Sequence, residues 1–178
     1  MERNIATDEK KDVSGTTFGR SLLALLLKLA IIAVIGVLLF GYVFGLNRNA
    51  SLNMQPALCD GDLILYYRIV QRYSAGDVVM VRYQDRTLAQ RVVAVAGDTV
   101  DITSAGLIIN GSAVQEPGVL GETTQFAQGV AFPLTVPVGH LFLLGDNRPH
   151  ATDSRIFGCV DIGDVKGEVI GLFRRRNL

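Results

Sequence analysis

Hydrophobic residues are distributed in two different ways along the chain, and the change comes near residue 47. From Leu29 to Leu46 the sequence carries no charge, and a second apolar run, Leu22 to Leu27, precedes it across Lys28. About 20 apolar residues span a bilayer, and a lysine near the edge of a span can extend its ammonium group to the lipid headgroups. We therefore predict one transmembrane helix, with the anchor over residues 21–46.

The flanks of this run distinguish an anchor from a cleaved signal and predict its orientation. The run is longer than the core of a secretory signal and ends in Tyr42 and Phe44 in place of a small-x-small cleavage site, so we expect it to stay uncleaved. Basic residues precede the run, whereas Arg48 alone follows it closely. The positive-inside rule places residues 1–20, which lack an apolar period and are expected to be disordered, in the cytoplasm. Residues 47–178 are expected outside the cell membrane.

From Asp62 onward, short apolar runs alternate with turn residues, which is typical of β-strands. Asn110-Gly111 is a two-residue hairpin signal. The glycine- and threonine-rich residues 116–133 are expected to form a long surface loop. The expected strands are Leu63–Tyr67, Val78–Tyr83, Leu88–Val95, Thr99–Ile102, Leu107–Ile109 with a continuation at Val114, His140–Leu144 and Glu168–Phe173. The fold class is therefore mainly β, with antiparallel sheets or a partly open barrel behind one N-terminal transmembrane helix.

Composition narrows the possible functions of the exported part. Lys plus Arg and Asp plus Glu number 17 each, so the formal charge is zero and no basic field favours nucleic acid. Cys59 and Cys159 are too few for a disulfide framework, and separate thiols are favoured over a bond in an oxidising compartment. We expect neither a cofactor nor a metal site. Arg174-Arg175-Arg176 is interpreted as a solvated terminus, with contact to anionic headgroups as the alternative.

Five sequence blocks in a fixed order carry the most specific signal. After the apolar span come Ser51-Leu52-Asn53-Met54-Gln55-Pro56, then Gly61-Asp62-Leu63-Ile64 with Gly76-Asp77-Val78-Val79, then Gln90-Arg91-Val92-Val93-Ala94-Val95-Ala96-Gly97-Asp98, and last Gly145-Asp146-Asn147-Arg148 followed by Asp153-Ser154-Arg155. This set resembles the type I signal peptidases over residues 29–173. The short stretch between Gly97 and Gly145 is similar to the compact form typical of Gram-positive bacteria. The resemblance implies a signal-peptidase-like fold for residues 47–178.

The resemblance also implies a site whose chemistry has been removed. The family attacks the peptide with a serine that a neutral lysine deprotonates. Asn53 stands at the nucleophile position, Gln90 at the base position, Ser51 at the oxyanion position and Ala151 at a position that supports the lysine. An amide cannot accept a proton near pH 7, and loss of one member of such a unit costs about 10⁶ in rate. The frame near the cleft keeps the family's residues at Met54, Pro56, Asp146, Asn147, Arg148, Asp153 and Arg155. We therefore expect a pseudoenzyme in which the fold is used without the reaction.

A variant catalytic group is the alternative, and it would make the chain an active signal peptidase. Ser51 with His150 is the conceivable pair, but no third group orients the imidazole, so an exposed loop histidine is the preferred interpretation. Asp153 and Arg155 are expected to form an ion pair near the cleft. Ser154 is expected to be a turn residue and not a nucleophile.

A frame retained without its chemistry favours a binding protein. We expect an extended peptide or a partner subunit to add as a strand beside Ala50–Asn53 and Leu88–Val93. Signal-peptidase-like proteins of some Gram-positive pilus clusters lack the same serine and lysine and act as accessory factors in pilin polymerisation. Similarity to them implies a membrane-anchored pilus assembly factor whose partners are pilin subunits and a sortase. A regulator that binds signal peptides or an active peptidase is the third hypothesis.

Overall fold

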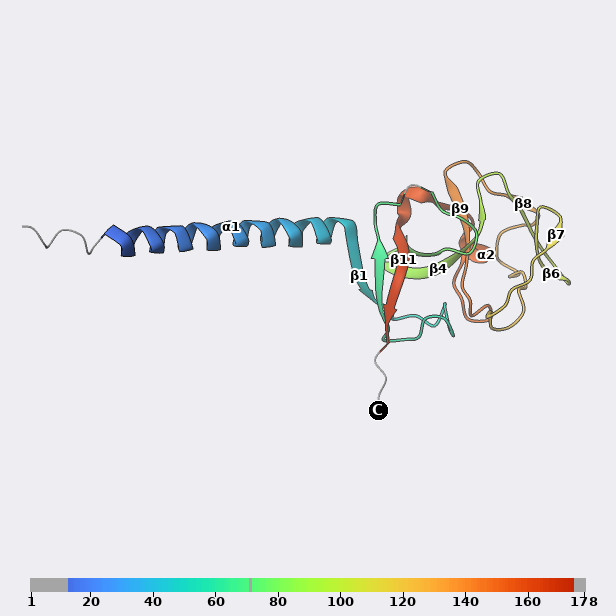
Figure 1. The fold of residues 1–178 in the computed structure, drawn as a ribbon. Coiled ribbons are helices and arrows are strands. Elements are labelled where there is room, and N and C mark those ends of the chain that lie inside the picture. The colour runs from blue at the N-terminus through green and yellow to red at the C-terminus, as the bar shows by residue number, and fades with distance from the viewer. Residues whose placement is uncertain (1–12, 71, 175–178) are drawn as a thin grey trace, which may run out of the picture. The chain divides into compact units, whose positions relative to one another are not determined.

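The chain contains a long N-terminal helix and a separate β-rich unit that begins at Val43. The computed structural model describes residues 13–70 and 72–174. The helix, α1, covers Val13–Val43 (Figure 1). Its segment Gly19–Val43, 25 residues long, has the length and apolar composition needed to cross a membrane. At 1.5 Å per residue this segment is about 37 Å long, more than the hydrocarbon core of a bilayer.

The ends of α1 differ from the expected anchor. The helix stops at Val43, three residues before the expected end, and Phe44–Arg48 forms strand β1. Phe44-Gly45-Leu46 extends the apolar composition of the span, but its apolar side chains alternate as they do in a strand. Residues 13–20 are helical and not part of a disordered tail, and residues 1–12 of that expected tail lie outside the described residues.

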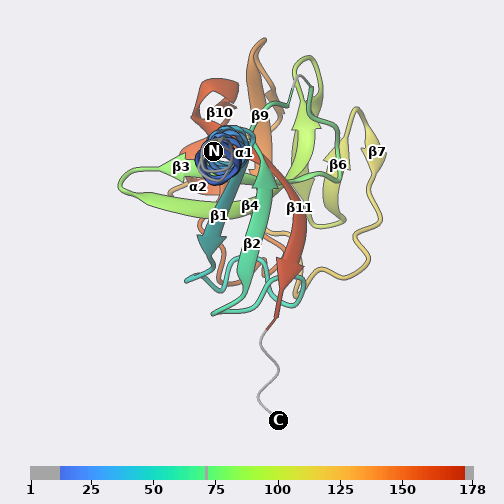
Figure 2. The same ribbon diagram turned by 60° about the vertical axis from the view of Figure 1, so that its left-hand side comes forward.

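Seven strands form the larger sheet, in the order β1-β2-β11-β3-β4-β9-β10, and every neighbouring pair is antiparallel. Figure 2 shows β1, β2 and β11 side by side at one edge of this sheet, apart from β6 and β7. The strands are β1 (Phe44–Arg48), β2 (Leu63–Tyr67), β3 (Val78–Tyr83), β4 (Arg86–Val95), β9 (His140–Leu144), β10 (Val160–Asp161) and β11 (Val165–Phe173).

The smaller sheet has the order β7-β6-β5-β8. Its strands are β5 (Thr99–Thr103), β6 (Gly106–Ile109), β7 (Ser112–Ala113) and β8 (Leu134–Thr135), and two short helical segments, α2 (Ser154–Phe157) and η1 (Ile162–Asp164), follow β9. Neither sheet closes on itself in the described part of the chain, so the fold is a pair of open antiparallel sheets and not a barrel. Asn110 and Gly111 have φ values of 52° and 80°, which confirms the predicted hairpin turn.

Alternation along the strands divides the core of the larger sheet between its two faces. On β3, Met80 belongs to a cluster with Met54, whereas its neighbours Val79 and Val81 belong to a cluster on the opposite face. A third cluster joins the two sheets and contains Ala94, Val100, Ile102, Leu107, Val136, Phe142 and Leu144. Because both faces of β3 and β4 are covered, these two strands form a rigid centre from which β4 presents Gln90.

The longer strands agree with the sequence prediction, and the shortest elements were missed. Leu63–Tyr67, Val78–Tyr83 and His140–Leu144 are strands with the predicted bounds. Two-residue strands such as β8 and β10 are too short to show an alternating pattern. Residues 116–133 contain no named helix or strand among the described residues, so the predicted long loop is confirmed.

Candidate functional site

The segment after β1 is a compact turn that presents Asn53. Asn49 ties the two ends of this turn together. Its backbone N–H donates to Asp62 O at 2.8 Å, and its side-chain amide donates to Ser51 O at 3.0 Å and to Cys59 O at 2.9 Å. Met54 is buried in the cluster beneath the sheet, whereas Pro56 is exposed at the outer side of the turn. The turn is therefore held both by its ends and by one buried side chain.

Asn53 is held by three hydrogen bonds, one within this turn and two to the loop that follows β9. Its backbone N–H donates to Ser51 Oγ at 3.1 Å, and its carbonyl oxygen accepts the backbone N–H of Asn147 at 2.8 Å. Its side-chain Nδ2 donates to the carbonyl oxygen of Thr152 at 3.3 Å. The side-chain amide of Asn147 donates to Leu52 O at 3.1 Å, which ties the same two segments together again.

Gln90 reaches the same carbonyl oxygen from strand β4. It lies on β4 with no exposed surface, and its Nε2 donates to Thr152 O at 2.8 Å. One backbone carbonyl oxygen therefore accepts from both side chains, and this brings Asn53 and Gln90 together. Gln90 Oε1 is buried without a hydrogen-bond partner. The NH₂ end of each amide must face Thr152 O, because an amide oxygen there would oppose another oxygen.

The loop that carries Thr152 is packed tightly against the turn. Ala151 is buried and has no hydroxyl group to offer the site. A Cβ atom on Gly145 would lie 2.5 Å from Ala151 Cβ and 2.6 Å from Asn53 O. A side chain at position 145 would therefore separate the loop from Asn53, so this glycine is required for the close approach.

Three arginine–carboxylate pairs fix this loop to its surroundings. Arg91 on β4 binds Asp146 through two hydrogen bonds of 2.8 and 2.6 Å. The nearly inaccessible Arg148 donates to Gly145 O at 2.8 Å and also binds Glu116 and Thr123 of the long loop. The Arg91 contact is bidentate and both pairs are charge-assisted, so they orient the backbone more strictly than single neutral hydrogen bonds.

The third pair is the ion pair expected between Asp153 and Arg155. Both side chains are buried, and Arg155 Nε and NH2 donate to the two carboxylate oxygens at 2.9 and 2.8 Å. Asp153 also accepts the backbone N–H of Gly145 at 3.2 Å. Ser154 is fully buried, and its hydroxyl accepts the backbone N–H of Leu143 at 2.9 Å. The expected ion pair is therefore formed, whereas Ser154 is the first residue of α2 and not a turn residue.

The alternative pair of Ser51 and His150 is not assembled. His150 is exposed in its loop, and no hydrogen bond between described residues joins its ring to Ser51. The hydroxyl of Ser51 accepts from Asn53 N–H. A serine without a base within hydrogen-bond reach is a weak nucleophile.

Arg174 is exposed, as expected of a solvated terminus, but its guanidinium also forms an ion pair that the sequence did not predict. Phe173 pairs with Leu63 across β11 and β2, so Arg174 lies next to Asp62. Its guanidinium binds both carboxylate oxygens of Asp62, the shortest contact being 2.7 Å, and also Ala57 O at 3.1 Å. This arginine holds the pKa of the Asp62 carboxyl below its usual range, even though burial acts in the opposite direction. Arg175 and Arg176 lie outside the described residues.

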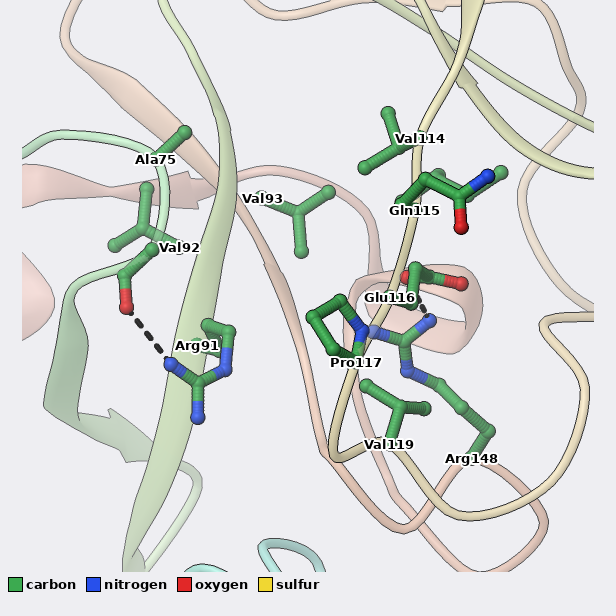
Figure 3. A pocket seen from close by; sticks show the side chains of 12 residues that line it. Ala75, Arg91, Val92, Val93, Val114, Gln115, Glu116, Pro117, Val119 and Arg148 are labelled. Carbon is green, nitrogen blue, oxygen red and sulfur yellow. Dashed lines mark hydrogen bonds and ion pairs between the residues drawn. The ribbon is translucent and has the colours of Figure 1, made fainter.

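A separate cavity of about 310 Å³ lies beside β4. Figure 3 shows Arg91 and Val93 of β4 on one side of it and Glu116, Pro117 and Val119 of the long loop on the other. Asn53 and Gln90 do not line it, so this cavity is distinct from the site around Thr152.

Two further expectations concern cysteines and metals. Cys59 and Cys159 are free thiols, as favoured from the sequence. Burial raises the pKa of the Cys159 thiol. In the described ranges, no group of three His, Cys, Asp or Glu side chains has the arrangement of a metal site.

Comparison with known proteins gives the family. Residues 22–173 match the family described as signal peptidase, peptidase S26. The chain belongs to the signal peptidase family. Signal peptidase I of Bacillus licheniformis is 33% identical over 154 residues, which cover 79% of this chain and 82% of that protein. Mitochondrial inner membrane protease subunit 1 of Schizosaccharomyces pombe is 29% identical over 139 residues, covering 72% and 73%.

A crystal structure of a signal peptidase I from Enterococcus faecalis V583 is also similar, with 28% identity and a TM-score of 0.46, and the match covers 56% of this chain and 97% of that one. The match to the family description and the identity to the Bacillus licheniformis protein confirm, at the level of the signal peptidase family, the resemblance expected from the sequence blocks. The sequence did not indicate Thr152 or Gly145 as site residues. Thr152 acts through its backbone carbonyl, which every residue type carries, and Gly145 acts through an absent side chain.

Proposed function

We propose that this protein is a membrane-anchored member of the signal peptidase family that binds an extended peptide without cutting it. The carrying observation is that Asn53 Nδ2 and Gln90 Nε2 both donate to the carbonyl oxygen of Thr152. Both positions therefore act as hydrogen-bond donors to the frame, and they contribute to the architecture of the cleft in place of catalysis.

Hydrolysis would require different properties at these two positions. A nucleophile needs a lone pair of high basicity and a base within hydrogen-bond reach, but an amide nitrogen is a donor whose lone pair is delocalised. Gln90 Oε1 is buried, and amide oxygens are not protonated near pH 7. The backbone N–H of Asn53, which would stabilise an oxyanion, donates to Ser51 Oγ. These contacts support a cleft that holds a peptide in its ground state.

The peptide-binding part of the proposal rests on the edge of β4. β9 pairs with β4 only from Arg91 to Val95, so the register leaves Arg86–Gln90 without a strand on that side among the described residues. Val92 exchanges hydrogen bonds with Gly76 and Asp77 on the β3 side. By the two-residue period of a strand, the N–H and C=O groups of Ala89 and Thr87 face the open side, where an extended peptide can pair with them.

The experiment compares binding and cleavage by the same full-length preparation in detergent. A labelled pre-protein peptide is offered to wild type, to Ser51→Ala and to the double variant Asn53→Ser with Gln90→Lys, with signal peptidase I of Bacillus licheniformis as the positive control. We expect wild type to bind the peptide, by fluorescence anisotropy, and to leave it intact. Restored cleavage by the double variant would show that the cleft retains the orientation needed for the reaction.

One outcome would establish the alternative, an active signal peptidase with a variant catalytic group. Cleavage by the wild-type protein that disappears in Ser51→Ala would overturn the non-cleaving proposal. The similarity to proteins named signal peptidase I is the observation that keeps this alternative in the experiment. If wild type neither binds nor cuts the peptide, the peptide-binding proposal is contradicted.

The identity of the biological partner is a second, more specific part of the proposal. We propose that the bound segment belongs to a pilin subunit and that the protein works beside a sortase in pilus assembly, with similarity to degenerate pilus-associated relatives as the support. A deletion strain should fail to build full-length pili, and Ser51→Ala should restore them. Full-length pili in the deletion strain would refute the pilus role while leaving peptide binding untouched. Binding to an active peptidase in place of a pilin would favour a regulator.

A further inference from the structure

The cavity beside β4 reaches from the surface of the protein into its apolar interior. Buried Val92 and Leu107 line it together with exposed Ala75, Gln115 and Pro117. Its volume is about 310 Å³. A cavity of about 150 Å³ is enough for benzene, so this one can hold a molecule of about twelve non-hydrogen atoms. The cavity therefore has the size and the lining of a small-molecule site.

Arg148 brings a hydrogen-bond donor without a partner to this cavity. Its side chain lines the cavity and is only 1% exposed. Its Nε donates to Gly145 O and its Nη1 binds Glu116 and Thr123, whereas Nη2 has no hydrogen-bond partner among the described residues. Figure 3 shows this guanidinium beside Glu116 and Pro117. Because a guanidinium nitrogen can only donate, a ligand that meets Nη2 must carry an acceptor.

The charges around the cavity are balanced, and this selects the kind of acceptor. Arg148 is paired with Glu116, and Arg91 is paired with Asp146. A carboxylate ligand would be repelled by Glu116, which lines the cavity, and an ammonium ligand would be repelled by the two arginines. Water would meet the unpartnered nitrogen but leave the apolar lining hydrated. A neutral oxygen on an apolar molecule meets both requirements.

We propose that this cavity binds a small neutral molecule with an apolar body and one carbonyl oxygen, such as an amide, whose oxygen accepts from Arg148 Nη2. The apolar body would pack against Val93 and Leu107, which line the same cavity. This inference goes beyond the proposed peptide binding and does not depend on it, because Asn53 and Gln90 do not line the cavity.

The absence of tryptophan from this sequence allows a direct test. Gln115→Trp places one fluorophore at the cavity, and Gln128→Trp is the matched control, because Gln128 is exposed in the same long loop and does not line the cavity. Both full chains in detergent are titrated with hydrocinnamamide, with the anion hydrocinnamate and with the cation phenylpropylammonium. We expect the amide to change the emission of Gln115→Trp saturably and that of Gln128→Trp not at all. The two charged probes should bind at least about tenfold more weakly than the amide.

A second substitution that fills the cavity locates the binding. In the Gln115→Trp chain, Val93→Phe should abolish the response to the amide, and Ala75→Phe at the exposed side of the cavity takes its place if Val93→Phe does not fold. A response that persists in the filled variant overturns this cavity as the site.

The remaining outcomes each contradict a defined part of the proposal. Tighter binding of either charged probe overturns the choice of a neutral ligand. Equal binding of all three probes overturns the role of Arg148 Nη2. The same response in Gln128→Trp shows partition of the probe into detergent and not binding to the cavity. No response of Gln115→Trp to any probe overturns the proposal, while leaving the proposed peptide binding untouched.

Discussion

The carbonyl oxygen of Thr152 joins Asn53 and Gln90, two side chains that come from separate segments of the chain. It accepts from Asn53 and from Gln90, and the second donor leaves its own Oε1 buried without a partner. A made hydrogen bond contributes about 1 kcal/mol, whereas an unmet buried acceptor costs about 1–3 kcal/mol. The amide group of Gln90 therefore contributes little net stability to the fold. Which end of the amide faces Thr152 O matters more than whether an amide is there at all.

Two substitutions of similar size separate these contributions. Gln90→Met removes both the donor and the unmet oxygen, so we expect the free energy of unfolding to change by less than about 1.5 kcal/mol. Gln90→Glu places a carboxyl oxygen against Thr152 O in a site without exposed surface, and we expect a loss of more than about 2 kcal/mol at pH 7. Thermal and urea unfolding of the full chain in detergent measures both. Equal losses would show that the bond from Gln90 Nε2 dominates.

The sequence predicted which segments belong to this site better than it predicted the hydrogen bonds between them. Similarity to the signal peptidases singled out Asn53 and Gln90, and the buried pair of Asp153 and Arg155 was expected from the last sequence block. The shared acceptor could not be foreseen, because the side chain of Thr152 has no part in it. Glu116, which binds Arg148, is separated from it by a long loop whose path no local pattern describes.

At the scale of elements, strand prediction worked where alternation was long enough to be seen. β3 and β9 have the predicted bounds, since each has a clear apolar run bounded by turn residues. β1 was missed because its apolar residues follow the apolar helix without a break. Gly45 on β1 lies against Tyr66, so closely that a Cβ would come within 2.1 Å of a ring atom. That contact is between strands and leaves no mark in the local sequence.

The pair of Asp62 and Arg174 links the end of β11 to the turn that carries Asn53, and its contribution depends on pH. Arg174 lowers the pKa of Asp62 in the folded state. A lowered carboxyl pKa stabilises the fold at pH values above the unfolded pKa, about 3.9, and this stabilisation is lost as the pH falls through the folded value. We expect Asp62→Asn to lower the melting temperature at pH 7 and to differ less from wild type below pH 4.

The exposed neighbour Asp60 provides the control for this experiment. Asp60→Asn makes the same chemical change two residues away, and we expect its melting temperature to stay close to that of wild type across the pH range. A constant difference between Asp62→Asn and wild type at all pH values would show that the carboxylate charge is not the stabilising feature.

At the scale of the whole molecule, the orientation across the membrane is a prediction that the two thiols can test. Both cysteines lie after the helix, in the unit expected outside the cell. A membrane-impermeant maleimide should label the full chain in intact cells, and the variant with Cys59→Ser and Cys159→Ser should stay unlabelled. Cys159 should react more slowly than an ordinary thiol, because burial raises its pKa and so lowers its thiolate fraction. Labelling only after permeabilisation would indicate the reverse orientation.

The direct passage from Val43 into Phe44 also has a consequence for the proposed peptide binding. Asn53 is the tenth residue after Val43, and a fully extended chain of ten residues reaches about 34 Å. Asn53 therefore stays within this radius of the end of the helix at Val43 in every orientation. If α1 spans the membrane, polypeptides held at the same lipid surface would meet the proposed binding edge of β4 at a high effective concentration, whereas freely diffusing ones would not. Ligands would then reach the protein by diffusion in the plane of the membrane. Membrane attachment would thus restrict the available ligands before any side-chain contact discriminates among them.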